Sequence, residues 1–234
     1  MERKVKSATS SRSYDATRRK QAAQRSRHAI AEQARRVFIE HGYHGATMAG
    51  IARAAGVSHE TVYAMFGPKP ALFRHLIETA LSGADEPIPA LEREAVRQAR
   101  AEPSPTRTIE LFAHIVCQLH QRLAPLFAVL TDAARSDADL HALADELNAR
   151  RVEHMRFFVE ELRSKDGLRG EVPVELATDM IWAMNSTEFY LLFVRDRGWS
   201  PEAYEAWLAE TWKRLLLPHG AVEGASPLGV DGMR

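Results

Sequence analysis

Residues 47–73, TMAGIARAAGVSHETVYAMFGPKPALF, decide the fold. This stretch predicts two short helices, over 48–55 and 59–66, because a polar capping residue precedes each one and a glycine follows it. The glycine between them, Gly56, is expected to adopt a positive φ. A helix this short is marginal alone in water, so longer helices must brace the pair. The pattern is typical of a helix-turn-helix head.

The bracing helices flank this stretch on both sides. The helix before it is expected to end at Gly42, and the helix after it to cover 69–81. Each has apolar residues at helical spacing: Ile30, Ala34, Val37 and Phe38 in the first, and Leu72, Phe73, Leu76 and Ile77 in the second. Ala52 and Val62 are expected to pack where the two short helices cross.

The rest of the chain predicts helices alone, without a strand pattern or an internal repeat. We therefore expect an all-α fold of about nine helices, with a three-helix head and a C-terminal helical domain. The expected domains are a basic, disordered arm (1–26), the helix-turn-helix head (27–82), an effector-binding and dimerisation domain (83–217) and a flexible tail (218–234).

Charge separates the two ends of the chain, although the net charge is zero. Residues 1–83 hold 14 Lys and Arg against 6 Asp and Glu, whereas residues 84–234 hold 17 against 25. The basic N-terminal part therefore predicts binding to a polyanion such as DNA, and the acidic remainder of the chain predicts a different function.

Several classes of protein are disfavoured. The sequence has no apolar run of membrane-spanning length and no secretory signal at its start, and its single cysteine, Cys117, suits the reducing cytoplasm. His114, Cys117 and His120 lie on one predicted helix, but His120 drifts around it, so we predict no metal site. No phosphate-binding loop or catalytic motif is evident, and we predict no cofactor and no enzyme activity.

The head resembles the DNA-binding domain of the TetR family of bacterial repressors over about residues 27–82. The matching residues are Thr47, Ile51-Ala52, Ala55-Gly56-Val57-Ser58, Thr61, Val62, Tyr63, Phe66, Lys69 and Leu72-Phe73. The resemblance implies phosphate contacts from Thr47, Ser58, Tyr63 and Lys69, and base-edge contacts from His59, Glu60 and Thr61. It departs from the family at Met65, where a phosphate-binding histidine is common, and at Glu60, where a small residue is frequent.

Glu60 leaves two interpretations open. Its carboxylate could accept a hydrogen bond from a cytosine N4 amine, or it could pair with His59 or Arg53. The basic arm also leaves two interpretations open. Its cations could reach the minor groove of DNA, or they could only make the terminus more soluble. These cations are Arg18, Arg19, Lys20, Arg25 and Arg27.

The C-terminal helices predict a homodimer. The stretch 180–194 is apolar on every helical face, and such a helix must be buried on every side. A four-helix bundle between two copies would achieve this, as the family resemblance implies, and would place two recognition helices on a pseudo-palindromic operator. The residues expected in this interface are Ile181, Tyr190, Leu191, Tyr204, Leu208 and Trp212.

The remaining inner residues predict a cavity for a small apolar or amphipathic effector. The expected lining is Phe112, Ile115, Val116, Leu119, Leu126, Met155, Phe158, Trp182, Asn185 and Phe189. Asn185 and Glu188 stand out because polar groups amid apolar faces need partners, which either another helix or a ligand could provide.

The sequence thus predicts a cytoplasmic, homodimeric, sequence-specific DNA-binding regulator, most simply a repressor released from its operator by a small-molecule effector. Two alternatives stay open: a DNA-binding regulator without an effector, and an all-α enzyme that binds a small molecule.

Overall fold

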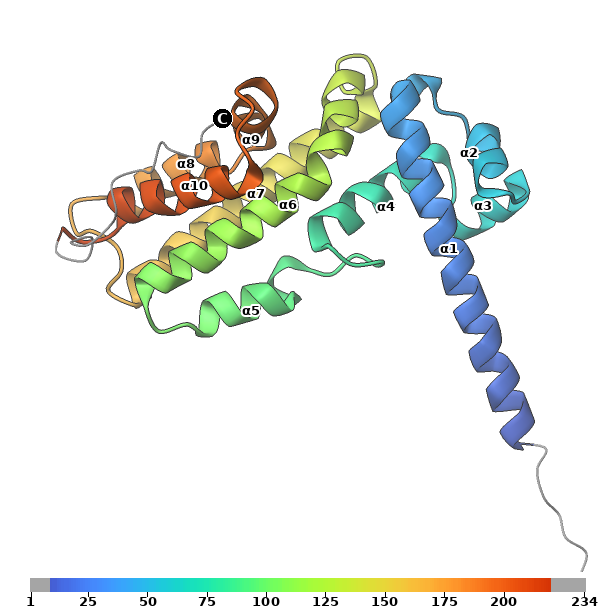
Figure 1. Ribbon diagram of the computed structural model, residues 1–234, viewed down its shortest axis with the longest axis horizontal. Coiled ribbons are helices and arrows are strands. Elements are labelled where there is room, and N and C mark those ends of the chain that lie inside the picture. Colours follow the sequence, from blue (N-terminus) through green and yellow to red (C-terminus); the bar gives the residue numbers. More distant parts are fainter. Residues whose placement is uncertain (1–8, 220–234) are drawn as a thin grey trace, which may run out of the picture. The chain divides into compact units, whose positions relative to one another are not determined.

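The computed structural model describes residues 9–219 of the 234-residue chain (Figure 1). The described residues contain helices and no strand, so the all-α prediction is confirmed. In chain order the elements are α1 (Thr9–Gly45), α2 (Met48–Ala55), α3 (His59–Phe66), α4 (Lys69–Ser82), the 3₁₀ turn η1 (Ala90–Glu92), α5 (Glu94–Ala101), α6 (Pro105–Ala133), α7 (Ala138–Ser164), α8 (Val174–Met184), α9 (Thr187–Leu191), the π-helical turn η2 (Leu192–Asp196) and α10 (Pro201–Leu216). The tail expected over 218–234 lies outside the described residues from position 220 onward.

The chain divides into two compact units after Leu76, inside α4, rather than at the boundary expected after residue 82. Side chains of the second unit hold the last part of α4, which explains the earlier boundary. Arg150 of α7 makes two hydrogen bonds to the carboxylate of Glu78, at 2.9 and 3.1 Å, and Arg122 of α6 donates to the carbonyl of Ala80 at 3.1 Å.

The first unit is a helix-turn-helix head in which α2 packs against both α1 and α3. Its centre is aromatic: the ring of Phe38 contacts those of Tyr43 and Phe73, with centroids 5.8 and 4.9 Å away. The other fully buried side chains of this core include Ile30, Ala34, Ile51, Val62 and Leu72. The apolar periodicity therefore identified the inner faces, and the longer α1 and α4 brace the two short helices as predicted.

Backbone geometry at Gly56 fixes the turn between α2 and α3. Its φ and ψ of 68° and 28° are left-handed, and its N–H caps the end of α2 on the carbonyl of Arg53. The next N–H, of Val57, bonds the carbonyl of Ala52 at 3.0 Å. The positive φ predicted for Gly56 is confirmed.

Gly56→Ala is expected to lower the free energy of unfolding by about 1 kcal/mol, because an L side chain is strained at this φ although nothing lies within 4 Å of the added Cβ. Urea unfolding measures the change. Gly170→Ala is the matched control, since Gly170 also has open space around it but no positive φ. Equal losses in the two variants would contradict the assigned role of the turn.

Helix α1 begins at Thr9, so residues 9–26 are helical and the disordered arm expected over 1–26 is corrected. Residues 9–41 contain neither glycine nor proline, and adding residues to a helix already held by packing costs little. The helix is interrupted at Gly42, whose φ of 68° is not helical. Residues 1–8 and the side chains of Arg19 and Lys20 lie outside the described part of the chain.

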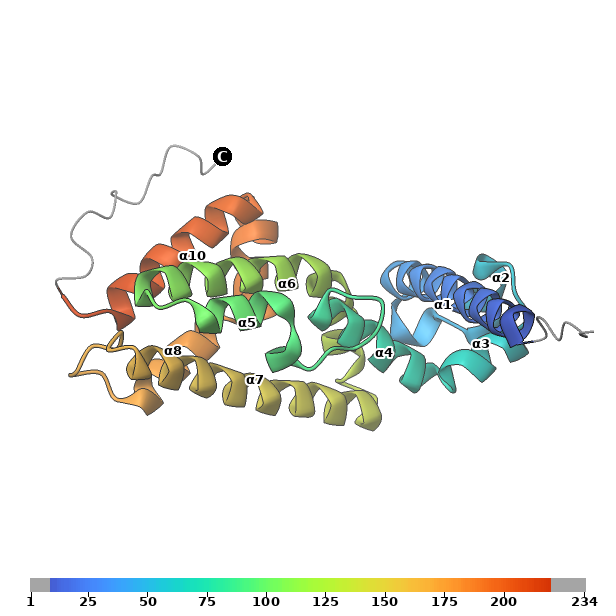
Figure 2. The same ribbon diagram turned by 90° about the horizontal axis from the view of Figure 1, so that it is seen from below.

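The second unit is built on the long helices α6 and α7, which run antiparallel side by side (Figure 1). Helix α10 packs on α6, α8 packs on α7, and α5 lies along α6 (Figure 2). Helix α6 continues through Pro125 without a new start. Helix α5 is the least buried of these helices to judge by its own residues, since only Ala99 among them is buried.

The apolar stretch 180–194, expected to be one helix, is interrupted, and that prediction is wrong. The structure ends α8 at Met184 and starts α9 at Thr187, because the hydroxyl of Ser186 accepts a hydrogen bond from the N–H of Phe189 at 3.0 Å and caps a new helix. This break lets α8 and α9 turn different faces inward, so Ile181 and Tyr190 are both buried within one chain, while Leu192 stays about half exposed.

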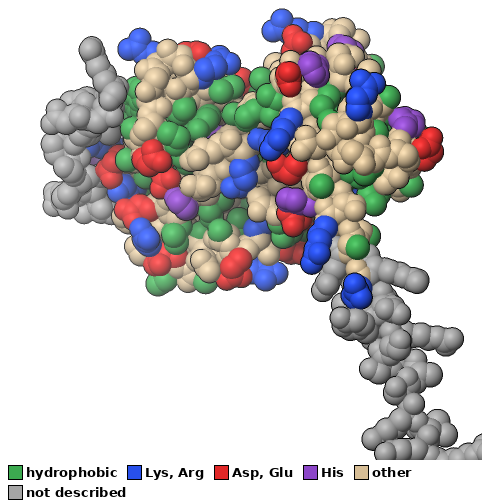
Figure 3. Space-filling view, turned by 45° about the vertical axis from the view of Figure 1, so that its right-hand side comes forward, with side chains coloured by type: hydrophobic (Ala, Val, Ile, Leu, Met, Phe, Trp, Pro, Cys, Tyr) green, Lys and Arg blue, Asp and Glu red, His purple; other side chains and the backbone are tan. Residues whose placement is uncertain are grey.

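The surface is mixed in character. On the face shown in Figure 3, acidic and basic side chains lie close together, with hydrophobic side chains between them. Exposed large hydrophobic residues of the second unit include Leu176 and Leu192, about half exposed at 51% and 53%. Within residues 9–219, no helix has the length and apolar character needed to cross a bilayer.

Candidate DNA-binding surface and ligand cavity

Helix α3 presents a polar surface at its N-terminal end. His59, Glu60 and Tyr63 are exposed, Tyr63 at 54%, and the rings of His59 and Tyr63 stack with centroids 6.4 Å apart. Thr61 is half-buried, and Val62 on the opposite face is fully buried. Because the helix N-terminus carries unpaired N–H groups and a positive dipole, this surface suits an anionic backbone with base edges beside it.

Both predicted N-caps are confirmed. The hydroxyl of Thr47 accepts from the N–H of Gly50 at 3.0 Å, and the hydroxyl of Ser58 accepts from the N–H of Thr61 at 3.2 Å. Helices α2 and α3 therefore have fixed starting points, which sets the positions of the exposed side chains on α3.

Glu60 is turned towards the start of its own helix. The pKa of its carboxyl lies below the ordinary value, because its own backbone N–H and then the Ser58 hydroxyl bind the charged form, helped by His59. No ion pair with Arg53 forms among the described residues. The local pairing left open by the sequence thus involves Ser58 and His59, and the cytosine contact stays a prediction.

Two cations expected at DNA also hold the head together. The ammonium of Lys69 donates to the carbonyls of Tyr43 (2.9 Å) and Ala46 (3.1 Å) and lies over the Tyr43 ring. Arg27 donates to the carbonyl of Met65 at 2.6 Å and lies 4.4 Å from the centre of the Phe66 ring. Both side chains stabilise helix C-termini, a role that the sequence did not indicate, and their phosphate contacts stay predictions.

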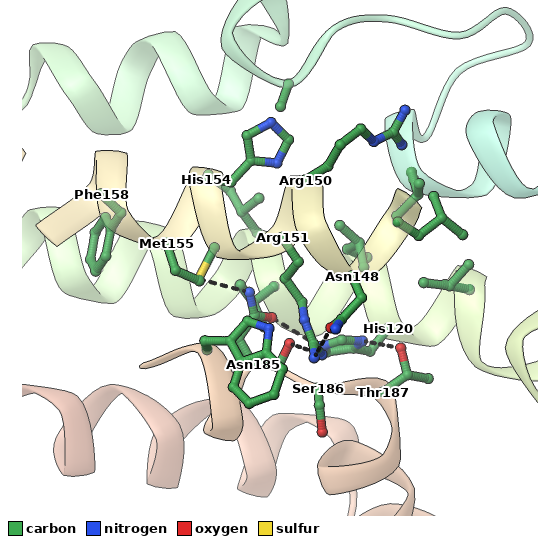
Figure 4. Close-up of a pocket in the computed structure, with 18 of the residues that line it drawn as sticks. His120, Asn148, Arg150, Arg151, His154, Met155, Phe158, Asn185, Ser186 and Thr187 are labelled. Atoms are coloured by element: carbon green, nitrogen blue, oxygen red, sulfur yellow. Dashed lines mark hydrogen bonds between the residues drawn. The ribbon is translucent and has the colours of Figure 1, made fainter. Parts of the chain in front are cut away.

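The second unit contains a cavity of about 930 Å³, bounded by α5, α6, α7 and the junction of α8 and α9. This volume lies within the usual range for small-molecule sites. Eight of the ten predicted residues line it: Phe112, Ile115, Val116, Leu119, Met155, Phe158, Trp182 and Asn185. The predicted cavity is therefore present, and Figure 4 shows part of its lining.

Leu126 and Phe189 do not line the cavity, and those two predictions are wrong. Leu126 is fully buried. Phe189 packs instead on Phe193 and Trp207, with centroids 5.2 and 5.8 Å away, because the new helix after Ser186 rotates it out of register with Trp182.

A chain of hydrogen bonds crosses the cavity wall from α7 to α6 and α9 (Figure 4). The amide of Asn185 donates to the sulfur of Met155 at 3.0 Å, and its oxygen contacts Nε2 of His120 at 3.1 Å. The other ring nitrogen, Nδ1, contacts the Thr187 hydroxyl at 3.3 Å. Protein partners thus satisfy Asn185, one of the two outcomes that the sequence left open.

His120 is buried and neutral in this chain of bonds. Burial lowers the pKa of His120 to about 4, against a smaller opposing effect of the Asn185 hydrogen bond, and the nearby charge of Arg151 lowers it further. The neutral ring then donates from Nε2 to the Asn185 oxygen and accepts at Nδ1 from Thr187. Sequence reasoning considered His120 only as a metal ligand and missed this role.

Arg151 ties α7 to the break between α8 and α9. Its guanidinium donates to the backbone carbonyl of Asn185 at 3.0 Å and to the side-chain oxygen of Asn148 at 3.1 Å. It also lies 4.8 Å from the centre of the Trp182 ring. A charged donor therefore occupies the carbonyl left open where α8 ends.

Further cations line another part of the cavity. Arg93, at the start of α5, and Arg150 and His154, one turn apart on α7, all belong to the lining. Burial, then the charges of Arg93 and Arg150, lower the pKa of His154. The only sequence signal for this group is the helical spacing of Arg150 and His154 on a face that also carries Phe157.

The predicted dimer interface is mostly inside the chain. Ile181, Tyr190, Tyr204, Leu208 and Trp212 are buried in the core of the second unit, and Leu191 packs half-buried against it. The buried five belong to the core that α6, α8, α9 and α10 form together. Their assignment to a dimer surface is corrected, whereas that of Leu191 stays a prediction.

Cys117 and its neighbours form no metal site in the described part of the chain, where no three His, Cys, Asp or Glu side chains are grouped for one. The Cys117 thiol instead donates to the carbonyl of Pro201 at 3.2 Å, and burial raises the pKa of the thiol to about 11. His114 points elsewhere, to the carboxylate of Glu205 at 3.0 Å. Cys117 is thus an unreactive packing residue.

Comparison with known proteins agrees with this architecture. Residues 30–76 match the family model of bacterial regulatory proteins of the tetR family. No curated protein sequence matches the chain significantly.

Solved structures share the whole fold. NalD, the secondary repressor of the MexAB-OprM multidrug efflux pump in Pseudomonas aeruginosa, is 21% identical with a TM-score of 0.63 over 84% of this chain and 98% of its own. The fatty acid degradation regulator FadR from Bacillus halodurans is 20% identical, with a TM-score of 0.63 over 79% and 96%. The TetR-family regulator PfmR from Thermus thermophilus is 21% identical, with a TM-score of 0.59 over 80% and 97%.

The helix-turn-helix geometry, the family match and the shared fold lead to one conclusion. Residues 30–76 match the family model of bacterial regulatory proteins of the TetR family and form a helix-turn-helix head, and the chain as a whole has the fold of the solved regulators named above.

Proposed function

We propose that this transcriptional regulator is a homodimeric repressor that acts in the cytoplasm, where bacterial DNA is found, and leaves its operator when a small molecule fills the cavity of the second unit. The observation that carries the proposal is this cavity, about 930 Å³, whose lining combines apolar side chains with charged and polar groups. A chain that bound DNA constitutively would have no need of such a space, since filling it would increase the free energy of unfolding.

Release requires that the effector bind one arrangement of the protein better than another, because tight binding alone shifts no equilibrium. Helix α4 is a direct route, since its first residues belong to the head and its last to the second unit. Glu78 on α4 pairs with Arg150, which lines the cavity. An effector that alters this pair would move α4 and with it the helix-turn-helix.

A dimer is proposed because two recognition helices bind a duplex far better than one and read a two-fold-symmetric site. The residues first assigned to the interface are buried, so the contact must use other faces of the C-terminal helices. Leu176 and Leu192, about half exposed, are the large apolar side chains available there. Leu192→Glu should shift sedimentation of the full chain towards the monomer.

The experiment that tests the function has two stages. A compound library is first screened for ligands that raise the Tm of the full chain, and each ligand found is then added to the operator complex at fixed salt. We expect at least one ligand to lower operator affinity tenfold or more, by roughly 1.4 kcal/mol. Ligands that raise the Tm and leave operator affinity unchanged would instead support the alternative of an effector-independent regulator.

An enzyme remains the other alternative from the sequence. If the protein were an enzyme, the bound ligand would be converted to a product during incubation. Chromatography of each ligand after incubation with the protein distinguishes the two, since an effector is recovered unchanged.

A further inference from the structure

The cations around Arg93 lack a matching set of carboxylates, whereas Arg100, elsewhere in the lining, is paired with Glu161 at 2.9 Å. Arg93 donates from Nε to the carbonyl of Ile88 at 3.0 Å, and the described residues offer it no ion pair. The two terminal nitrogens of Arg150 bind Glu78, at 2.9 and 3.1 Å, whereas its buried Nε has no partner among the described residues. His154 has no hydrogen-bond partner among the described side chains, although its ring faces the cavity.

The charge balance at this place is positive. Arg93 lies close enough to Glu78 and Arg150 for their charges to act on it, so the half-buried carboxylate of Glu78 faces two guanidinium groups. Glu146, 3.7 Å from Arg150, is exposed on the outer side of α7 and is partly screened by water. An anion entering the cavity would therefore meet a net positive charge where Arg93 lies beside the Arg150–Glu78 pair.

Next to these cations the lining becomes apolar. Because α6 and α7 run antiparallel, Phe112 of α6 and Phe158 of α7 meet beyond His154, where their rings stack on each other with centroids 3.9 Å apart and together line the cavity. Ile115, Leu119 and Val96 complete this side. The cavity thus has a cationic part and an apolar part, a polarity that matches a molecule with a charged head and a hydrocarbon chain.

We propose that the cavity binds a single-chain aliphatic carboxylate, with its head group at Arg93, Arg150 and His154 and its chain along Phe112, Ile115 and Phe158. The proposal rests on the proposed function, in that this cavity is taken to be the effector site. A guanidinium matches a carboxylate with two parallel hydrogen bonds, and the terminal nitrogens of Arg93 are the donors available for them.

Arg151, a further cation of the wall, is held mainly by protein groups. Its terminal nitrogens donate to the carbonyl of Asn185 and the side chain of Asn148, and its buried Nε has no partner among the described residues. Its guanidinium also covers one face of the Trp182 ring, which a quaternary ammonium ligand would otherwise use. The same cations therefore favour an anionic head group and oppose a cationic one.

The test compares three ligands that share one chain: decanoate, decanol and decyltrimethylammonium, each titrated calorimetrically into the full chain below its micelle concentration. We expect decanoate to bind at least tenfold more tightly than decanol, and decyltrimethylammonium to bind more weakly than either. Arg93→Met should weaken decanoate about tenfold and leave decanol unchanged.

Arg97→Met is the matched control, because Arg97 is exposed on the same helix and does not line the cavity. It should change no affinity. The proposal is overturned if native protein prefers decanol, if it binds none of the three ligands, or if Arg93→Met and Arg97→Met behave alike. The comparison in native protein decides the matter even if Arg93→Met fails to fold.

Operator affinity measured with and without decanoate separates this proposal from the function on which it rests. If decanoate binds as expected and operator affinity is unchanged, the carboxylate site stands and effector-controlled release fails. If decanoate does not bind and another ligand releases the operator, the function stands and the carboxylate site fails.

Discussion

Replacing His59 and Tyr63 together by alanine is expected to lower affinity for the operator about 100-fold, the product of two contacts worth roughly 1–2 kcal/mol each. Both side chains are exposed on the first turns of α3, and their rings stack on each other. Neither contributes to the core of the head, so the Tm should stay the same. Fluorescence anisotropy with a labelled operator at fixed salt measures the loss.

His41→Ala is the control for this double variant, because His41 is an exposed histidine of the head on α1, away from α3. Its operator affinity should match that of the native protein. A double variant that binds the operator as well as the native chain would refute the assignment of α3 as the recognition helix.

Acidification from pH 7 to pH 4 is expected to remove about 3 kcal/mol of stability through His120 alone. Its pKa is about 4 in the folded chain and takes the ordinary value of 6.5 in the unfolded chain, so the unfolded chain binds the extra proton first. The contribution is complete above pH 6.5 and is lost progressively as pH falls from there towards 4. Urea unfolding across this pH range measures it.

His120→Gln removes the titrating ring and keeps a donor for the oxygen of Asn185. It should therefore unfold with a shallower pH dependence than the native chain, whose carboxylates contribute equally to both curves. His141→Gln, at an exposed site on α7 with a side chain 68% accessible, should keep the native pH dependence. Identical slopes for native and His120→Gln protein would show that His120 does not titrate as described.

Local signals made the head predictable from sequence. The caps at Thr47 and Ser58, the turn at Gly56 and the apolar face of α1 each depend on residues within a few positions of one another. Helix caps and turns depend on residues close together in the sequence, so the positions of the short helices could be predicted from the sequence alone.

Contacts distant in sequence explain what could not be predicted. The bond between His120 and Asn185 spans 65 positions, and that between Arg150 and Glu78 spans 72. The apolar pattern around Tyr190 indicated burial correctly but could not say whether the same chain or a second one buries it. One hydroxyl, that of Ser186, decided this by starting a new helix.

The central claim is that α3 reads DNA sequence as one of a symmetric pair, and selection of bound fragments from a random pool of duplexes tests it most directly. The account predicts an enriched consensus with two-fold symmetry, whose half-sites are centred one helical turn, about 34 Å, or a multiple of it apart. The His59 and Tyr63 double variant should fail to enrich it. Two results would contradict the account. Selection could enrich no sequence over the starting pool, or the double variant could enrich the same consensus as the native protein.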